Sequence, residues 1–121
     1  MTLKNLYDAI GASYDDTIER LMSADFLLRF VRKFPDDPSF AALKDALARG
    51  STEEAFRAAH TLKGVCGNLG LGGLQRSAGE LTEMLRRRAR PIPAEARPLL
   101  EAVERDYERT AAAIGTFLEE R

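Results

Sequence analysis

The chain has 121 residues, 45% of them hydrophobic, which is typical of one compact domain with a single core. Eighteen basic and nineteen acidic residues give a formal net charge of -1, which argues against a general nucleic-acid binder. No apolar run approaches the roughly 18 residues that a membrane span needs, and a single histidine excludes chemistry that requires two.

The sequence of the N-terminal third predicts two helical segments, the second of them with an interruption. Residues 3–10 form a short apolar-rich segment that a Gly-Ala-Ser sequence ends. Between residues 14 and 34, apolar side chains recur at spacings near three and four, which is typical of an amphipathic helix. We expect an interruption at residues 23–25, because Ser and Asp compete for backbone hydrogen bonds and suit helix caps.

Proline, glycine and capping residues mark the next helices. Asp37 as a cap and Pro38 at the first helical position predict the start of a helix that Gly50 ends. Ser51, with Glu54 three residues later, has the pattern of a capping box and opens the following helix. That helix is expected to end at the glycine-rich turn that follows residue 69.

Two further helices are predicted in the C-terminal half. A leucine-patterned segment starts at Leu74 and leads into an arginine-rich run at residues 86–90. We interpret this run as a solvated helix end, favoured by the helix dipole, rather than as a nucleic-acid or membrane patch. After prolines between residues 91 and 98, a last helix is predicted to run almost to residue 121.

The predicted fold is all-α: an antiparallel four-helix bundle with a short extra N-terminal helix, forming one domain over residues 1–121. Amphipathic helices joined by short links bury their apolar stripes against one another. Sixteen leucines and eighteen alanines against seven valines plus isoleucines also favour helices. Cys66 is the only cysteine, so an internal disulfide is excluded and a reducing cytoplasm is expected; the N-terminus lacks the pattern of a secretory signal.

The helix that carries His60, the only histidine, separates an apolar face from a polar one. On a helical wheel His60 lies roughly 130° from the middle of the apolar cluster, so we expect its imidazole to face solvent. Cys66 lies on the apolar side, which predicts a small core residue rather than a metal ligand or a redox switch. The apolar face comprises Ala55, Ala59, Leu62, Cys66 and Leu69.

Four residues share the stripe of His60 at helical spacing: Phe56, Lys63, Gly64 and Gly67. Glycine costs about 1 kcal/mol relative to alanine inside a helix, so two glycines beside the histidine need a reason. Small residues there let another surface approach the imidazole closely. Lys63, one turn away, supplies a cation, and an exposed imidazole with a nearby cation suits phosphoryl transfer to histidine.

The segment from His60 to Leu71 resembles the signature of histidine-containing phosphotransfer (HPt) domains. The match comprises a His-x-x-Lys-Gly core at His60, Lys63 and Gly64, then small residues and a closing Gly-Leu, followed by a leucine-patterned helix. The resemblance implies a four-helix bundle and a phosphorelay intermediate. His60 would accept a phosphoryl group from an aspartate of one receiver domain and pass it to another, with Lys63 stabilising the group and Gly64 giving access.

The same resemblance implies the partners and cofactors. The partners would be receiver domains of response regulators, with a hybrid histidine kinase as one source of such a domain. The receiver would bring Mg²⁺, so the chain itself would need no cofactor and no metal, and it would carry phosphate without ATP-dependent kinase activity of its own. We expect a monomer, and no nucleic-acid or membrane partner.

The sequence leaves the roles of several residues near the predicted site undecided. Gln75 and Thr82, on the next helix, are candidates for orienting the second imidazole nitrogen or, with Phe56 and Gly67, for contacting the partner. The three phenylalanines at positions 26, 30 and 56 are expected mostly in the core, with one or two reaching the docking surface. The alternative function is a helical adaptor that binds a receiver or another partner without carrying phosphate.

Overall fold

The computed structural model of the protein describes residues 1–86 and 91–120, and within these ranges every regular element is a helix. This confirms the predicted all-α class. The elements in chain order are α1 (Leu3–Ala9), α2 (Tyr14–Leu21), α3 (Ala24–Lys33), the 3-10 helix η1 (Phe34–Asp36), α4 (Ser39–Ala48), α5 (Thr52–Leu69), α6 (Gly72–Arg86) and α7 (Ala96–Glu119).

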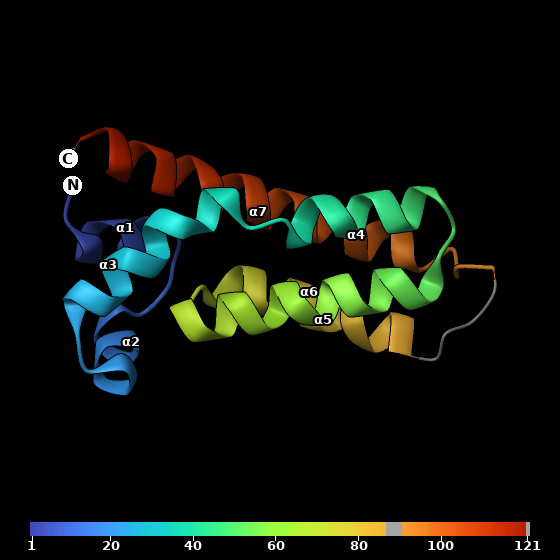
Figure 1. The fold of residues 1–121 in the computed structure, drawn as a ribbon, viewed down its shortest axis with the longest axis horizontal. Coiled ribbons are helices and arrows are strands. Elements are labelled where there is room, and N and C mark those ends of the chain that lie inside the picture. The colour runs from blue at the N-terminus through green and yellow to red at the C-terminus, as the bar shows by residue number, and fades with distance from the viewer. Residues whose placement is uncertain (87–90, 121) are drawn as a thin grey trace.

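Helices α4, α5, α6 and α7 form an antiparallel bundle, as predicted (Figure 1). Each packs against the next along the chain, and α7 spans most of the molecule, in contact with α6, α1 and η1 and, through the stacked rings of Phe40 and Tyr107, with α4. The short helices α1, α2 and α3 gather at the end where both termini lie. Helix α1 is the predicted short N-terminal helix, and α2 and α3 are the two parts of the helix predicted over residues 14–34, separated by the predicted break.

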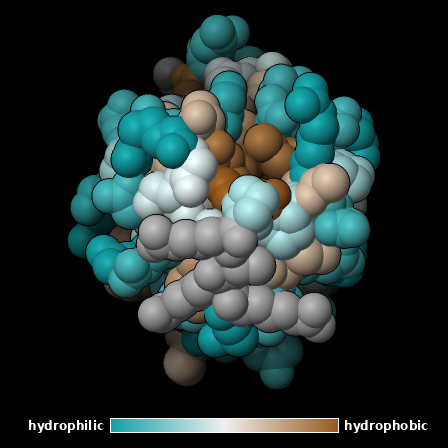
Figure 2. All heavy atoms as spheres, turned by 90° about the vertical axis from the view of Figure 1, so that its right-hand side faces the viewer, coloured by the Kyte–Doolittle hydropathy of each residue, from teal (hydrophilic) through white to brown (hydrophobic). Residues whose placement is uncertain are grey.

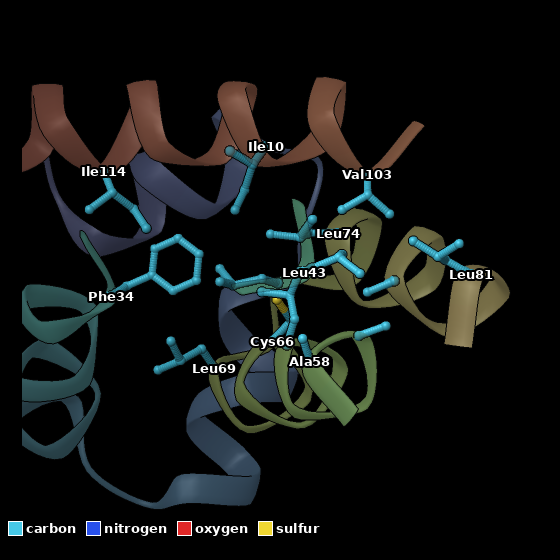
Figure 3. Packing of buried hydrophobic residues seen from close by; sticks show 14 of the residues in the cluster. Ile10, Phe34, Leu43, Ala58, Cys66, Leu69, Leu74, Leu81, Val103 and Ile114 are labelled. Atoms are coloured by element: carbon cyan, nitrogen blue, oxygen red, sulfur yellow. The ribbon is translucent and has the colours of Figure 1, made fainter. Parts of the chain in front are cut away.

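The core lies between the facing stripes of the bundle helices (Figure 3). Leu43 of α4, Cys66 of α5, Leu74 of α6 and Val103 of α7 are all fully or almost fully buried and point into the same interior. Burial of this kind is the main favourable contribution to folding, at roughly 25 cal/mol per Å² of apolar surface. The predicted core face of α5 is thereby confirmed, with Cys66 as a buried core residue.

The break predicted at residues 23–25 is confirmed. Met22 adopts a left-handed conformation with φ of 63° and ends α2. The hydroxyl of Ser23 then accepts a hydrogen bond of 3.1 Å from the backbone N–H of Phe26 and caps α3. The predicted start of α4 is off by one residue: the helix begins at Ser39 with Pro38 as its N-cap, and the carboxylate of Asp37 accepts a hydrogen bond of 2.9 Å from the backbone N–H of Ser39.

Helices α1 and α2 support the C-terminal end of α5. The buried Tyr7 donates its hydroxyl hydrogen to the carbonyl of Leu69, one of the last carbonyls of that helix, which have no partner within the helix itself. Arg20 donates to the carbonyl of Asn68 at 3.3 Å. Gly70 ends α5 with a left-handed φ of 68°, and a side chain there would clash with the hydroxyl of Thr17.

At the opposite end, the chain turns from α4 to α5 and enters α7. Hydrophobic atoms lie at the bottom of a hollow among hydrophilic ones at this end (Figure 2). A cavity of about 510 Å³ there is lined by apolar side chains that include Leu47, Ile92 and Leu100. The arginine-rich run at residues 86–90 lies outside the described residues, except for Arg86, so its reading as a solvated helix end stays a prediction. Within the described ranges, no helix has the length and apolar character to cross a membrane.

Candidate functional site

Helix α5 has one buried and one exposed face, because its contacts with the core and the cap at its start fix its orientation in the bundle. Its start is capped by Ser51, whose hydroxyl accepts the N–H of Glu54 at 3.4 Å, the first half of the predicted capping box. The carboxylate of Glu54 forms an ion pair of 2.6 Å with Arg49. Seven residues of the helix are buried against the bundle: Thr52, Ala55, Ala58, Ala59, Leu62, Cys66 and Leu69.

The opposite face of α5 carries His60 and the four residues predicted to share its side of the helix. His60 and Gly64 are exposed, whereas Phe56, Lys63 and Gly67 are half-buried beside α6. A β-carbon built on Gly64 would meet no atom within 4 Å among the described residues. The missing side chain therefore leaves open space one turn from the imidazole, as access for a second protein requires.

Lys63 extends across the neighbouring helix. Its Cε and Cδ lie 3.6 and 3.7 Å from the place that a β-carbon of Gly79 would occupy. The absence of a side chain on Gly79 thus makes room for the lysine stem. Within residues 1–86 and 91–120, no carboxylate forms an ion pair with the Lys63 ammonium, so this cation is available to an incoming anion.

A row of side chains connects α6 to the imidazole. The rings of Phe56 and His60 are stacked, with centroids 5.9 Å apart and an interplanar angle of 13°. The guanidinium of Arg86 lies 5.2 Å from the Phe56 centroid, and it donates two hydrogen bonds of 3.0 Å each to the two carboxylate oxygens of Glu83. The Arg86 hydrogen bonds lower the pKa of Glu83, and the positive charges of Arg86 and Lys63 lower it further.

Sequence reasoning missed Glu83 and Arg86 as neighbours of the histidine. Their spacing of three residues is that of an ion pair on one helical face, and this was the available signal. What the spacing could not give is the register of α6 against α5. That register places Lys63 beside Gly79 and Phe56 beside Arg86.

Two predicted residues do not lie where they were expected. Thr82 is fully buried and donates its hydroxyl to the carbonyl of Ala78 at 2.7 Å, so the prediction that it contacts a partner is wrong. Gln75 packs beside Gly67, with its Nε2 atom 3.0 Å from the position of a β-carbon on that glycine. Gly67 lies two turns from His60, about 10 Å along the helix axis, so Gln75 is too far away to orient the imidazole.

A second apolar surface lies between α3 and the C-terminal half of α5. Phe26 and Phe30 of α3 are 42% and 39% exposed, so these are the two of the three phenylalanines that reach the surface, whereas Phe56 is half-buried. Their rings contact each other, with centroids 4.7 Å apart. They line a groove of about 510 Å³ between α3 and α5, which also involves Val65, five residues after His60. The remaining lining residues of this α3/α5 groove are Leu21, Lys33, Phe34, Asp37, Asn68 and Leu69.

The arrangement is suited to the transfer of a small anionic group to and from a nitrogen atom. A neutral imidazole is a nucleophile, and a nearby cation offsets negative charge that gathers on the group transferred. The described residues contain no cluster of three or more His, Cys, Asp or Glu side chains that could hold a metal ion. Burial raises the pKa of the Cys66 thiol to about 12, which leaves that thiol unreactive in the core.

Comparison with known proteins gives one clear match. The profile of the family described as Hpt domain matches residues 25–113, well over half of the chain, and this range includes α3 to α6 and most of α7. No curated protein and no solved structure matches the chain significantly. Members of the matched family act as phosphoryl carriers in two-component signalling, interact with receiver domains and are not kinases. The histidine motif, the helical bundle and the extent of the match lead to one conclusion: the chain belongs to the Hpt domain family.

Proposed function

We propose that His60 is the phosphoryl-accepting residue of a phosphorelay, and that this chain takes the group from an aspartate of one receiver domain and passes it to another. The observation that supports the proposal is the face of α5, where an exposed imidazole lies between an open approach at Gly64 and the ammonium of Lys63, which forms no ion pair with a carboxylate of the described residues. Transfer of this kind can run in either direction.

The chemistry balances without a further reactant. An unprotonated imidazole nitrogen of His60 attacks the phosphorus of the aspartyl phosphate; an N–P bond forms, the P–O bond to the aspartate breaks, and the aspartate leaves as a carboxylate. The reverse step returns the group to a second aspartate. Lys63 offsets charge on the phosphoryl oxygens, and Gly64 admits the receiver. The Mg²⁺ ion belongs to the receiver in this account.

The α3/α5 groove supports a docking role on the same helix as His60, toward its C-terminal end. Phe26 and Phe30 offer an exposed aromatic pair, and aromatic side chains are enriched at protein interfaces. Lys33 places its ammonium 5.5 Å from the centroid of Phe30 and adds a positive charge at the rim. A receiver with an apolar patch and an acidic active site is complementary to this surface. A monomer and a cytoplasmic location remain predictions from the sequence.

The experiment mixes the purified protein with a receiver domain that carries labelled phosphate. Label that is stable in alkali and lost in acid should appear on the wild type and be absent from His60→Gln. Because His60 lies outside the core, the variant should keep its circular dichroism spectrum and its affinity for the receiver. Equal labelling of His60→Gln would overturn the assignment of the acceptor.

An adaptor that carries no phosphate is the second candidate, and the α3/α5 groove favours it because the groove does not need the histidine to bind a partner. This candidate predicts that wild type and His60→Gln both bind the phosphorylated receiver and that neither becomes labelled. The labelling experiment therefore separates the two functions directly.

A further inference from the structure

We infer that Phe56 is a positioning residue that holds the imidazole of His60 ready to react, and that Arg86 and Glu83 hold Phe56 in turn. The inference rests on the proposed function of His60. It also changes the assignment of Phe56, which the sequence presents as a partner-docking residue. The observation that supports this inference is a continuous row of contacts from Glu83 through Arg86 and Phe56 to the ring of His60.

The first contact in the row is the ring stack. Residues four apart on a helix can meet, and a phenylalanine at position 56 reaches the side chain at position 60. The centroid separation of 5.9 Å and the interplanar angle of 13° lie within the range of offset-stacked rings. An exposed imidazole without such a neighbour would sample several rotamers. The stack limits that sampling, and it does so without covering the open side at Gly64.

The second part of the row keeps Phe56 in place. Phe56 is half-buried and packs against the core, so its ring cannot swing freely into solvent. The Arg86 guanidinium lies 5.2 Å from the ring centroid, within the distance of a cation–π contact. The carboxylate of Glu83 holds that guanidinium by a bidentate pair of hydrogen bonds, which restricts its orientation more than a single ion contact does.

Orientation of this kind acts on the reaction rate rather than on binding. A nucleophile that is already aligned loses less freedom in the transition state, and small misplacements can lower rates by one or two orders of magnitude. Removal of the Phe56 ring should therefore slow transfer about tenfold while the affinity for the receiver stays the same. A docking residue would show the opposite pattern, with weaker binding and an unchanged rate at saturation.

The test compares Phe56→Leu with Phe56→Tyr and with a control, Phe26→Leu. Leucine keeps apolar bulk and helix propensity but removes the ring, whereas tyrosine restores the ring. Phe26 is an exposed phenylalanine of the α3/α5 groove, outside the row of contacts. For each variant, three quantities are measured: receiver affinity, transfer rate at saturating receiver, and the rate of phosphorylation by phosphoramidate. In the last reaction, the imidazole attacks phosphorus and ammonia leaves.

A spectroscopic signature completes the test, because the chain has one histidine and its ring signals in an NMR spectrum belong to His60 alone. The stacked Phe56 ring should shift these signals; Phe56→Leu should move them toward the values of an unstructured peptide, and Phe56→Tyr should restore them. We expect both transfer rates to fall in Phe56→Leu only. In Phe26→Leu, only the receiver affinity should fall.

The failure of this inference is distinguishable from the failure of the proposed function. If Phe56→Leu leaves the His60 signals and the phosphoramidate rate unchanged, the positioning role is wrong, whatever receivers do. If Phe56→Leu weakens receiver binding at an unchanged rate, Phe56 is a docking residue. If no receiver labels the wild type, yet Phe56→Leu alone alters the signals and the phosphoramidate rate, the relay proposal fails and the positioning role stands.

Discussion

The side chain of Lys63 on α5 crosses Gly79 on α6, with its Cε atom 3.6 Å from where a β-carbon of Gly79 would lie. This distance is ordinary van der Waals contact, so an alanine fits beneath the lysine without moving it. A larger side chain at position 79 would occupy the space that the lysine stem now uses. The position of the Lys63 cation thus depends on a residue of the neighbouring helix.

Two substitutions at Gly79 should have different effects. Gly79→Ala should raise the free energy of unfolding by about 1 kcal/mol, because alanine is the better helix former, and should leave transfer unchanged. Gly79→Leu should keep the fold but displace Lys63, and it should slow transfer by no more than Lys63→Ala does. Urea denaturation and transfer kinetics measure these outcomes. A wild-type transfer rate in Gly79→Leu would mean that the path of Lys63 has no role.

Substitution of Gly64 should separate stability from access. A β-carbon at Gly64 meets nothing within 4 Å among the described residues, so Gly64→Ala and Gly64→Leu should both fold, with alanine adding about 1 kcal/mol of stability. Leucine should block the receiver and reduce transfer from it strongly. Phosphorylation by phosphoramidate, a much smaller donor, should be reduced far less. Equal transfer from the receiver in wild type and Gly64→Leu would remove the access role of this glycine.

Tyr7→Phe should destabilise the fold by about 1–3 kcal/mol, because the carbonyl of Leu69 loses a buried hydrogen-bond donor. The matched control is Tyr14→Phe, since the described residues give the Tyr14 hydroxyl no hydrogen bond and phenylalanine keeps the packing of the ring against Tyr7 and the core. That control should change stability little. If the two variants unfold at the same urea concentration, the hydrogen bond of Tyr7 contributes nothing measurable.

Stability should fall as the pH rises above about 9. Burial raises the pKa of Cys66 from its usual 9.0 to about 12 and also raises the pKa of Tyr7. Between the unfolded and folded pKa values, the unfolded chain releases protons that the folded chain keeps, so alkaline pH favours unfolding. One such group gives a slope of up to about 1.4 kcal/mol per pH unit. Cys66→Ala should reduce the slope of unfolding free energy against pH between pH 9 and 11, and an unchanged slope would contradict this account of the thiol.

The sequence predicted the parts of the fold that depend on local signals. The Ser23 cap, the Ser51 cap and the core face of α5 could be predicted because caps and helical periodicity depend on residues close together in the sequence. The exposure of His60 followed from the same wheel. The boundary of α4 differed by one residue, which is the usual scatter of helix ends.

The features that the sequence did not predict depend on how neighbouring helices pack against each other. Thr82 is level with the histidine face but points into the core, and the rotation of α6 that decides this is set by packing. The sequence left open which of the phenylalanines at positions 26, 30 and 56 reach the surface; Phe26 and Phe30 do so, because they line the groove between α3 and α5. The link from Glu83 to His60 needs the register between two helices, which no spacing within one helix reveals.

The most direct test of the central claim is a three-protein relay. A receiver carrying labelled phosphate is mixed with a second, unlabelled receiver, alone or together with wild type or His60→Gln. The account predicts that label passes through this chain and reaches the second receiver only when wild type is present. Label that reaches the second receiver equally well with His60→Gln, or that enters the wild type and leaves it only as free phosphate, would contradict the claim that His60 carries phosphoryl groups between receivers.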